Sequence, residues 1–166
     1  RFVKSLTTNY VIISGYVAIL FGRSRGTEDV DMIIPRISKE ETVQLYNNLI
    51  DNGFWSINSS SGEETYELLN DNIAIRFADK GKVIPNMEVK FAKDTLDTIT
   101  LDKKIKIVTK EGDIMTSRID LQIAYKKFVL KSPKDMQDAA HLQKLFSVNE
   151  ENINKWKNIL QQHGRI

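Results

Sequence analysis

The fold of this chain is decided by the segment RGTEDVDMII, residues 25–34, in which two aspartates alternate with apolar residues. Asp29 and Asp31 are two positions apart, and in a β-strand such positions point to the same face, about 6.5–7 Å from each other. Two like charges at that separation repel by roughly 2–3 kcal/mol at an effective dielectric constant near 20. A cation between the carboxylates removes this cost. Mg²⁺ is the natural candidate, because it prefers oxygen ligands and combines one or two carboxylates with substrate phosphates.

The composition is that of an ordinary globular protein. The chain has 166 residues, of which 41% are hydrophobic and 28% are charged. Cysteine is absent, which leaves no disulfide or thiolate metal site and agrees with the reducing cytoplasm that we expect as its location. No apolar run is long enough to span a bilayer and no stretch has the form of a signal peptide, so we expect no membrane partner.

The charge of the chain says little about partners. The net charge is +2 at pH 7, which by itself is too small an excess to indicate a nucleic-acid-binding protein. Lysines 126, 127, 131 and 134 lie within nine residues. Such a cluster is either a solvated helix face or a patch for polyphosphate or RNA.

Hydrophobic periodicity predicts an α/β (α+β) fold, with strands and helices alternating first and helices clustering last. Strands are expected over residues 10–14, 29–34, 72–77, 87–92, 105–109 and 113–116. Helices are expected over residues 16–21, 39–50, 63–69, 121–130, 133–146 and 150–160. We expect a mixed β-sheet core at residues 1–117, flanked by helices, and a helical C-terminal part at residues 118–166 that packs on this core as one compact unit.

The order of these features resembles the nucleotidyltransferase superfold, the fold of DNA polymerase beta and its relatives. One strand ends at Gly15, the strand with Asp29 and Asp31 follows at a compatible distance, and Glu88 lies on a later strand. The resemblance implies a Gly-Gly/Ser turn for a triphosphate. It also implies that Asp29, Asp31 and Glu88 bind one or two Mg²⁺ ions.

The match is closer to one branch of the superfold. The segment RGTEDVD, residues 25–31, is similar to the R-x-T-x-D-x-D motif of the abortive-infection type nucleotidyltransferases, some of which act as toxins of toxin–antitoxin systems. That branch also carries a lysine on a later helix, followed by a Lys-Asp-x-x-Asp motif. Here Lys127 is followed at similar spacing by Lys134, Asp135 and Asp138, and Lys126 competes with Lys127 for the assignment.

The resemblance implies a role for each of these residues. Lys127 would neutralise phosphate charge during catalysis. The residues that would contact the nucleotide are Ser14, Gly15, Arg23, Arg25, Thr27, Lys134, Asp135 and Asp138. Structural alternatives stay open, because Thr27 could order its turn, Glu88 could pair with Lys90, and Asp135 could cap its helix.

One position departs from the family pattern. The second residue of the Gly-Gly/Ser turn is Tyr16 here, and Ser14 precedes the glycine. Tyrosine lacks the close backbone approach that glycine permits. Either Ser14 substitutes in the turn, or the arginines carry more of the phosphate charge.

The resemblance implies a magnesium-dependent nucleotidyltransferase. It would transfer a nucleoside monophosphate from a nucleoside triphosphate such as ATP to a hydroxyl acceptor and release pyrophosphate. Acceptors in the wider group are tRNA, proteins and small molecules, and the toxin-like branch makes tRNA or protein the natural choice and an antitoxin or toxin the natural partner. The alternatives are a catalytically degraded binding or regulatory protein on the same fold, and a small nucleic-acid-binding module.

Overall fold

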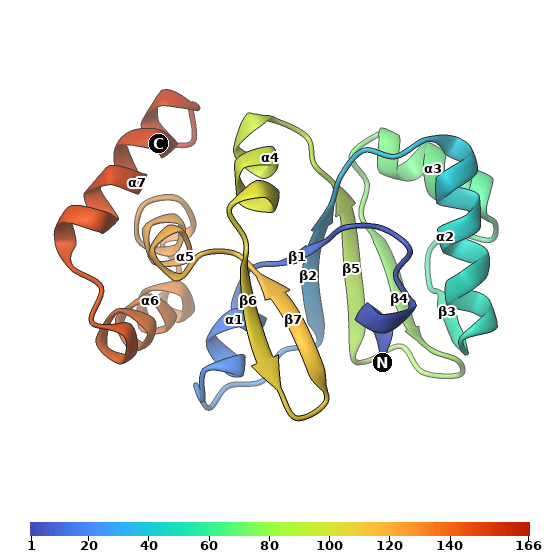
Figure 1. Ribbon diagram of the computed structural model, residues 1–166, viewed down its shortest axis with the longest axis horizontal. Helices are drawn as coiled ribbons and strands as arrows, with labels where there is room; N and C mark the ends of the chain where they lie inside the picture. Colours follow the sequence, from blue (N-terminus) through green and yellow to red (C-terminus); the bar gives the residue numbers. More distant parts are fainter.

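A seven-stranded mixed β-sheet runs through the computed structural model, which describes residues 1–166 (Figure 1). Its strands are β1 (Val11–Ile12), β2 (Asp29–Ile34), β3 (Phe54–Ser56), β4 (Ile75–Asp79), β5 (Asn86–Phe91), β6 (Ile105–Thr109) and β7 (Gly112–Thr116). Their order in the sheet is β3-β4-β5-β2-β1-β7-β6. Strand β2 is therefore central, and it pairs in parallel with β5 and antiparallel with β1.

Helices cover the sheet and build the C-terminal region. They are α1 (Gly15–Leu20), α2 (Lys39–Asp51), α3 (Gly62–Asn70), α4 (Thr95–Asp102), α5 (Ile119–Tyr125), α6 (Pro133–Phe146) and α7 (Glu150–Gln162), with a short 3-10 helix at Phe2–Ser5 and a π-helical turn at Lys126–Leu130. Helices α2 and α3 lie at the β3–β4 end of the sheet, and α5, α6 and α7 gather at the opposite end (Figure 1). None of these helices has the length and apolar character needed to cross a lipid bilayer.

The expected α/β architecture with a helical C-terminal region is confirmed, and several boundaries differ. Three elements were not predicted: the 3-10 helix at Phe2–Ser5, β3, which is too short to show an alternation, and α4. Helix α4 has the sequence TLDTITLD, which is rich in β-branched residues that lower helix propensity. Asp94 caps its N-terminus, where the Asp94 side chain accepts a hydrogen bond from the Asp97 backbone N–H. The strand expected from residue 72 begins at Ile75, because Asn72 adopts a left-handed conformation with φ 61°. The expected helix 121–130 is divided into α5 and the π-helical turn.

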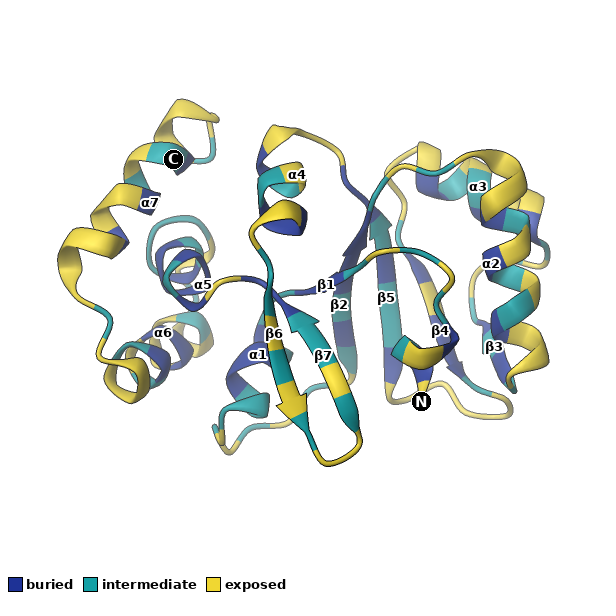
Figure 2. Cartoon of the chain, in the orientation of Figure 1, coloured by how far each residue is buried: buried dark blue, intermediate teal, exposed yellow.

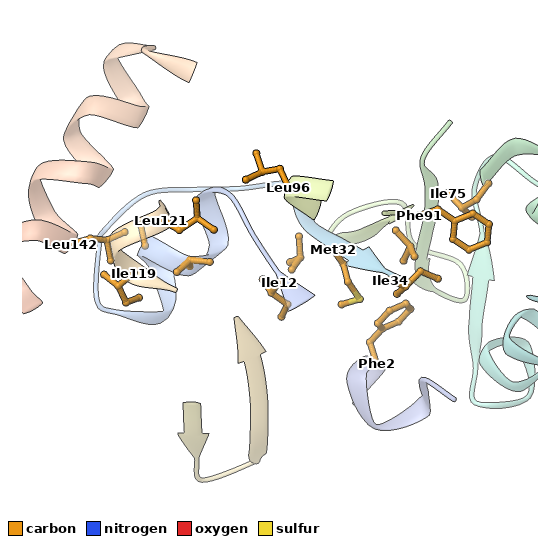
Figure 3. Close-up of a cluster of buried hydrophobic side chains, with 14 of the residues drawn as sticks. Phe2, Ile12, Met32, Ile34, Ile75, Phe91, Leu96, Ile119, Leu121 and Leu142 are labelled. Atoms are coloured by element: carbon orange, nitrogen blue, oxygen red, sulfur yellow. The ribbon is translucent and has the colours of Figure 1, made fainter. Parts of the chain in front are cut away.

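One hydrophobic core is shared by the sheet and the C-terminal helices. It contains 25 buried side chains, including Met32 and Ile34 of β2 and Leu142 of α6. Met32 and Ile34 lie near Phe2 in Figure 3, and Leu142 lies beside Ile119 at the other end of the same cluster. The outward faces of α2 and α7 are exposed, whereas the central strands are mostly buried (Figure 2).

We expect residues 1–117 and 118–166 to unfold together, because this core crosses the boundary between them. Replacing Leu142, which is fully buried, by alanine should lower the free energy of unfolding by about 2–5 kcal/mol. Leu145→Ala on the same helix is the control, since Leu145 is 53% exposed and its loss should change the free energy of unfolding by less than about 0.5 kcal/mol.

Denaturant unfolding followed by far-UV circular dichroism, and by Trp156 fluorescence in a Trp55→Phe background, measures both effects. The two signals should change at the same denaturant concentration in every variant. An early fluorescence transition in Leu142→Ala alone would contradict a shared core.

Candidate functional site

Two of the expected carboxylates lie side by side in the middle of the sheet. Strands β2 and β5 pair so that Asp31 stands opposite Glu88 and Asp29 stands opposite Asn86. The side chain of Asp31 is 21% exposed and that of Glu88 is 13% exposed. Both carboxylates are thus partly desolvated, and a small ligand can still reach Asp31.

Lys90 joins these two carboxylates. Its Nζ lies 2.7 Å from Glu88 Oε1 and 3.3 Å from Asp31 Oδ1. The second oxygen, Glu88 Oε2, accepts from Arg76 Nε at 3.3 Å. Burial alone would raise the pKa of Glu88 and lower that of Lys90, but their hydrogen bond and charges outweigh burial, so the pKa of Glu88 lies below and that of Lys90 above its ordinary value. Glu88 and Lys90 therefore form an ion pair at neutral pH.

Asp29 and Asp31 are the candidate carboxylates for a divalent cation, although Asp31 also contacts Lys90 at 3.3 Å. No three acidic or histidine side chains converge on one point, and Glu88 is engaged by Lys90. Asp29 and Asp31 present oxygen ligands on one face of β2, the chemistry that Mg²⁺ prefers when phosphate oxygens complete its shell. The Thr27 hydroxyl lies 2.9 Å from the Asp29 backbone carbonyl and 3.2 Å from Asp29 Oδ1, so Thr27 orders the start of the strand.

The turn between β1 and α1 is formed by Ser14 and Gly15. Ser14 has φ 66° and ψ −143°, a region that residues other than glycine rarely adopt and that costs on the order of 1–3 kcal/mol. Gly15 is buried, and a Cβ atom on it would lie 2.8 Å from Nη1 of Arg25. Tyr16 packs against the hydrophobic core. The turn thus combines Ser14 in a rarely adopted conformation with the Arg25 guanidinium lying against Gly15.

A buried carboxylate, Asp138, gathers three cations beside this turn. Asp138 Oδ1 lies 2.7 Å from Arg23 Nε, and its Oδ2 lies 2.5 Å from Arg25 Nη1 and 3.0 Å from Lys126 Nζ. Lys126 Nζ also lies 3.0 Å from Asp135 Oδ1. The side chains of Asp138 and Lys126 are 0% and 1% exposed. These five residues, the Asp138 cluster, join the segment before β2 to α6 and to the π-helical turn.

The structure brings Lys126 into this cluster and not Lys127, the residue that the sequence analysis favoured. Lys127 Nζ donates to Gln143 Oε1 at 2.9 Å and lies 3.3 Å from Glu150, away from Asp138. Lys134 is exposed and forms no ion pair. Helical spacing was the signal that could have identified Lys126. Ile119, Gln122 and Ile123 are buried and lie at positions i, i+3 and i+4 of one helix face. Lys126 is at position i+7, on the same buried face.

A pocket of about 240 Å³ opens beside Asp31. Ser14, Asp31 and Lys90 lie on its wall, and Leu96 of α4 with Leu121 and Tyr125 of α5 supply an apolar side. Sequence reasoning did not anticipate this pocket, because α4, which closes it, was not predicted. A partly apolar group that entered this pocket would lie next to Asp31.

Comparisons with known proteins support the fold. No protein-family model matches the sequence, and no curated protein matches it. The crystal structure of an antigenic nucleotidyltransferase-like protein from Paracoccidioides brasiliensis aligns with 96% of this chain and 83% of its own, at a TM-score of 0.53 and 19% identity. The solution structure of the antibiotic-resistance factor ANT(2'')-Ia aligns with 98% of this chain and 88% of its own, at a TM-score of 0.56 and 11% identity. The chain therefore has a nucleotidyltransferase-like fold.

The two adjacent lysines should differ sharply in their effect on stability. Lys126→Met leaves Asp135 and Asp138 partly unpaired in a buried place, so we expect the free energy of unfolding to fall by about 3 kcal/mol. Lys127→Met removes a partly exposed contact to Glu150 and should cost less than about 1 kcal/mol. Chemical denaturation of both variants measures the difference, and equal losses would contradict the assignment of Lys126 to the cluster.

The Asp138 cluster should make stability sensitive to acid. Burial alone would raise the pKa of the Asp138 carboxyl, but hydrogen bonds from Arg23 and Lys126 and nearby positive charge hold this pKa below its ordinary value of 3.8. The unfolded state therefore takes up a proton first as the pH falls. The stabilisation is complete above that ordinary value and is lost as the pH falls through the native pKa.

Asp138→Asn should lower the free energy of unfolding at pH 7 and flatten its decline between about pH 5 and pH 2. Asp51→Asn, at an exposed carboxylate at the end of α2, is the matched control and should leave the profile unchanged. Urea unfolding across this pH range gives the measurement. A decline as steep in Asp138→Asn as in the wild type would rule out this linkage.

Proposed function

We propose that this chain is a magnesium-dependent nucleotidyltransferase, which transfers a nucleoside monophosphate from a nucleoside triphosphate such as ATP to a hydroxyl acceptor. The observation that carries the proposal is the Asp29–Asp31 pair on the central strand, with the Ser14–Gly15 turn and its arginines nearby. The nucleotidyltransferase-like fold supports it by analogy, because fold alone does not determine activity.

In this reaction the acceptor oxygen attacks the α-phosphorus of the triphosphate, the bond to the bridging oxygen breaks, and pyrophosphate leaves. The hydroxyl proton passes to a carboxylate or to water. Asp29 and Asp31 would hold the divalent cation, which when bound neutralises phosphate charge and favours loss of the acceptor proton. Asp31 also lies on the wall of the pocket, where its carboxylate can orient an acceptor hydroxyl.

The Asp138 cluster would supply positive charge for binding the phosphates of the nucleotide. It contains three cations and two carboxylates, which leaves one net positive charge next to the Ser14–Gly15 turn. Arg25 is best placed, since its guanidinium lies against Gly15 and suits bidentate contact with phosphate. Lys126 is 1% exposed and paired with Asp135 and Asp138, so it would act by holding the cluster together and not by direct contact with a phosphate.

The pocket beside Asp31 would receive the reacting end of one substrate. Its volume of about 240 Å³ lies below the roughly 300–1,000 Å³ of typical small-molecule sites, so it suits a base or a single hydroxyl-bearing group. A tRNA end, a protein side chain and a small molecule can each present such a group. The similarity to abortive-infection nucleotidyltransferases favours tRNA or protein as acceptor, and an antitoxin or toxin as partner.

A nucleotide-binding protein without transferase activity is the second candidate. Two observations favour it: Lys90 engages the carboxylate Glu88, and Tyr16 stands where the family has glycine or serine. Such a protein would bind a nucleoside triphosphate and leave it intact.

Incubation with α-phosphate-labelled nucleoside triphosphates, Mg²⁺ and a cell extract tests the proposal. We expect label to appear on RNA or protein, and Asp31→Asn to reduce it at least about 100-fold, because charge stabilisation in the transition state is lost. Asp51→Asn, at an exposed carboxylate, should label like the wild type. Nucleotide binding without labelling would support the second candidate, and equal labelling by wild type and Asp31→Asn would contradict the proposed mechanism.

A further inference from the structure

We propose that Lys90 takes the place of a second divalent cation, so that the site binds one metal ion, on Asp29 and Asp31, and not two. This inference rests on the proposed function, because it concerns the cation of that same site. It assigns Glu88 as a positioning residue that holds Lys90, in place of the metal-ligand role implied by the family resemblance.

The position of Lys90 is set by the strands themselves. Lys90 lies two residues after Glu88 on β5, so both side chains point to the same face of the sheet. Asp31 stands opposite Glu88 on β2, on that face. The ammonium lies 2.7 Å from Glu88 Oε1 and 3.3 Å from Asp31 Oδ1, between the two carboxylates.

The oxygens of Glu88 are already occupied. Its Oε1 contacts Lys90, and its Oε2 accepts from Arg76 at 3.3 Å. A metal ion that bridged Asp31 and Glu88 would have to displace an ammonium from both carboxylates, or lie against its positive charge. Two-metal sites place their ions about 3.5–4 Å apart and need carboxylates free to bridge them.

The charges lead to the same conclusion. Asp29, Asp31 and Glu88 carry three negative charges, and Lys90 with Arg76 supplies two positive ones. The single remaining negative charge suits one divalent ion whose shell is completed by phosphate oxygens. Two such ions would leave the site strongly positive before the nucleotide arrives.

Manganese binding to the full chain tests this inference directly. The probe is Mn²⁺ in the presence of an ATP analogue that cannot be cleaved between the α- and β-phosphates, and the readout is the stoichiometry by calorimetry and electron paramagnetic resonance. We expect one protein-bound Mn²⁺ in the wild type, and a second site or at least tenfold tighter binding in Lys90→Met and Lys90→Ala. The Lys90 side chain is 40% exposed, so both variants should fold, which circular dichroism verifies.

Two controls separate the effect of the Lys90 charge from the effect of removing any lysine near β5. Lys90→Arg retains the cation and should bind one Mn²⁺, and Lys93→Met, at an exposed lysine just beyond β5, should behave like the wild type. Two ions in the wild type, or unchanged binding in Lys90→Met and Lys90→Ala, would overturn the inference and leave the proposed function intact. No Mn²⁺ binding in the wild type, with no effect of Asp29→Ala, would overturn both.

Discussion

The structure depends on a carboxylate, Asp138, that has no contact with water. An isolated buried carboxylate costs several kcal/mol, and the attraction of nearby cations offsets this only when the geometry is close. Asp138 meets that condition with Arg23, Arg25 and Lys126 at 2.5–3.0 Å. The two arginines come from the segment between α1 and β2, and Lys126 comes from the turn after α5. One buried charge therefore fixes the C-terminal helices against the segment that leads into the central strand.

This arrangement positions both halves of the candidate site. Arg25 contacts Asp138 and also lies against Gly15, so the Ser14–Gly15 turn is held from the side of α6. The central strand β2 continues from the same segment and carries Asp29 and Asp31 beside β5. The strain at Ser14 agrees with a turn kept for a ligand, since such backbone conformations persist where the surrounding structure enforces them. The residues proposed to hold the cation and those proposed to bind phosphate are thus positioned by one packing arrangement.

Much of the fold could be predicted, because its signals are local. The alternation around Asp29 and Asp31 identified β2, and hydrophobic periodicity identified the helix from residue 39, and the structure confirms both. The motif spacing does not distinguish Lys126 from Lys127, whereas the regular helical spacing from Ile119 places Lys126 on the buried face. The pairing of Glu88 with Lys90 was foreseeable from their spacing, whereas the bridge to Asp31 required the register of β2 and β5.

The central claim is that Asp29 and Asp31 hold one cation while Lys90 occupies the place beside Glu88. A crystal structure with Mn²⁺ and an uncleavable triphosphate analogue tests it most directly, because anomalous scattering locates each manganese ion. The expected result is one protein-bound peak at Asp29 and Asp31, Lys90 Nζ still between Asp31 and Glu88, and phosphate oxygens at the Ser14–Gly15 turn. A manganese peak between Asp31 and Glu88, or a triphosphate bound away from the turn, would contradict it.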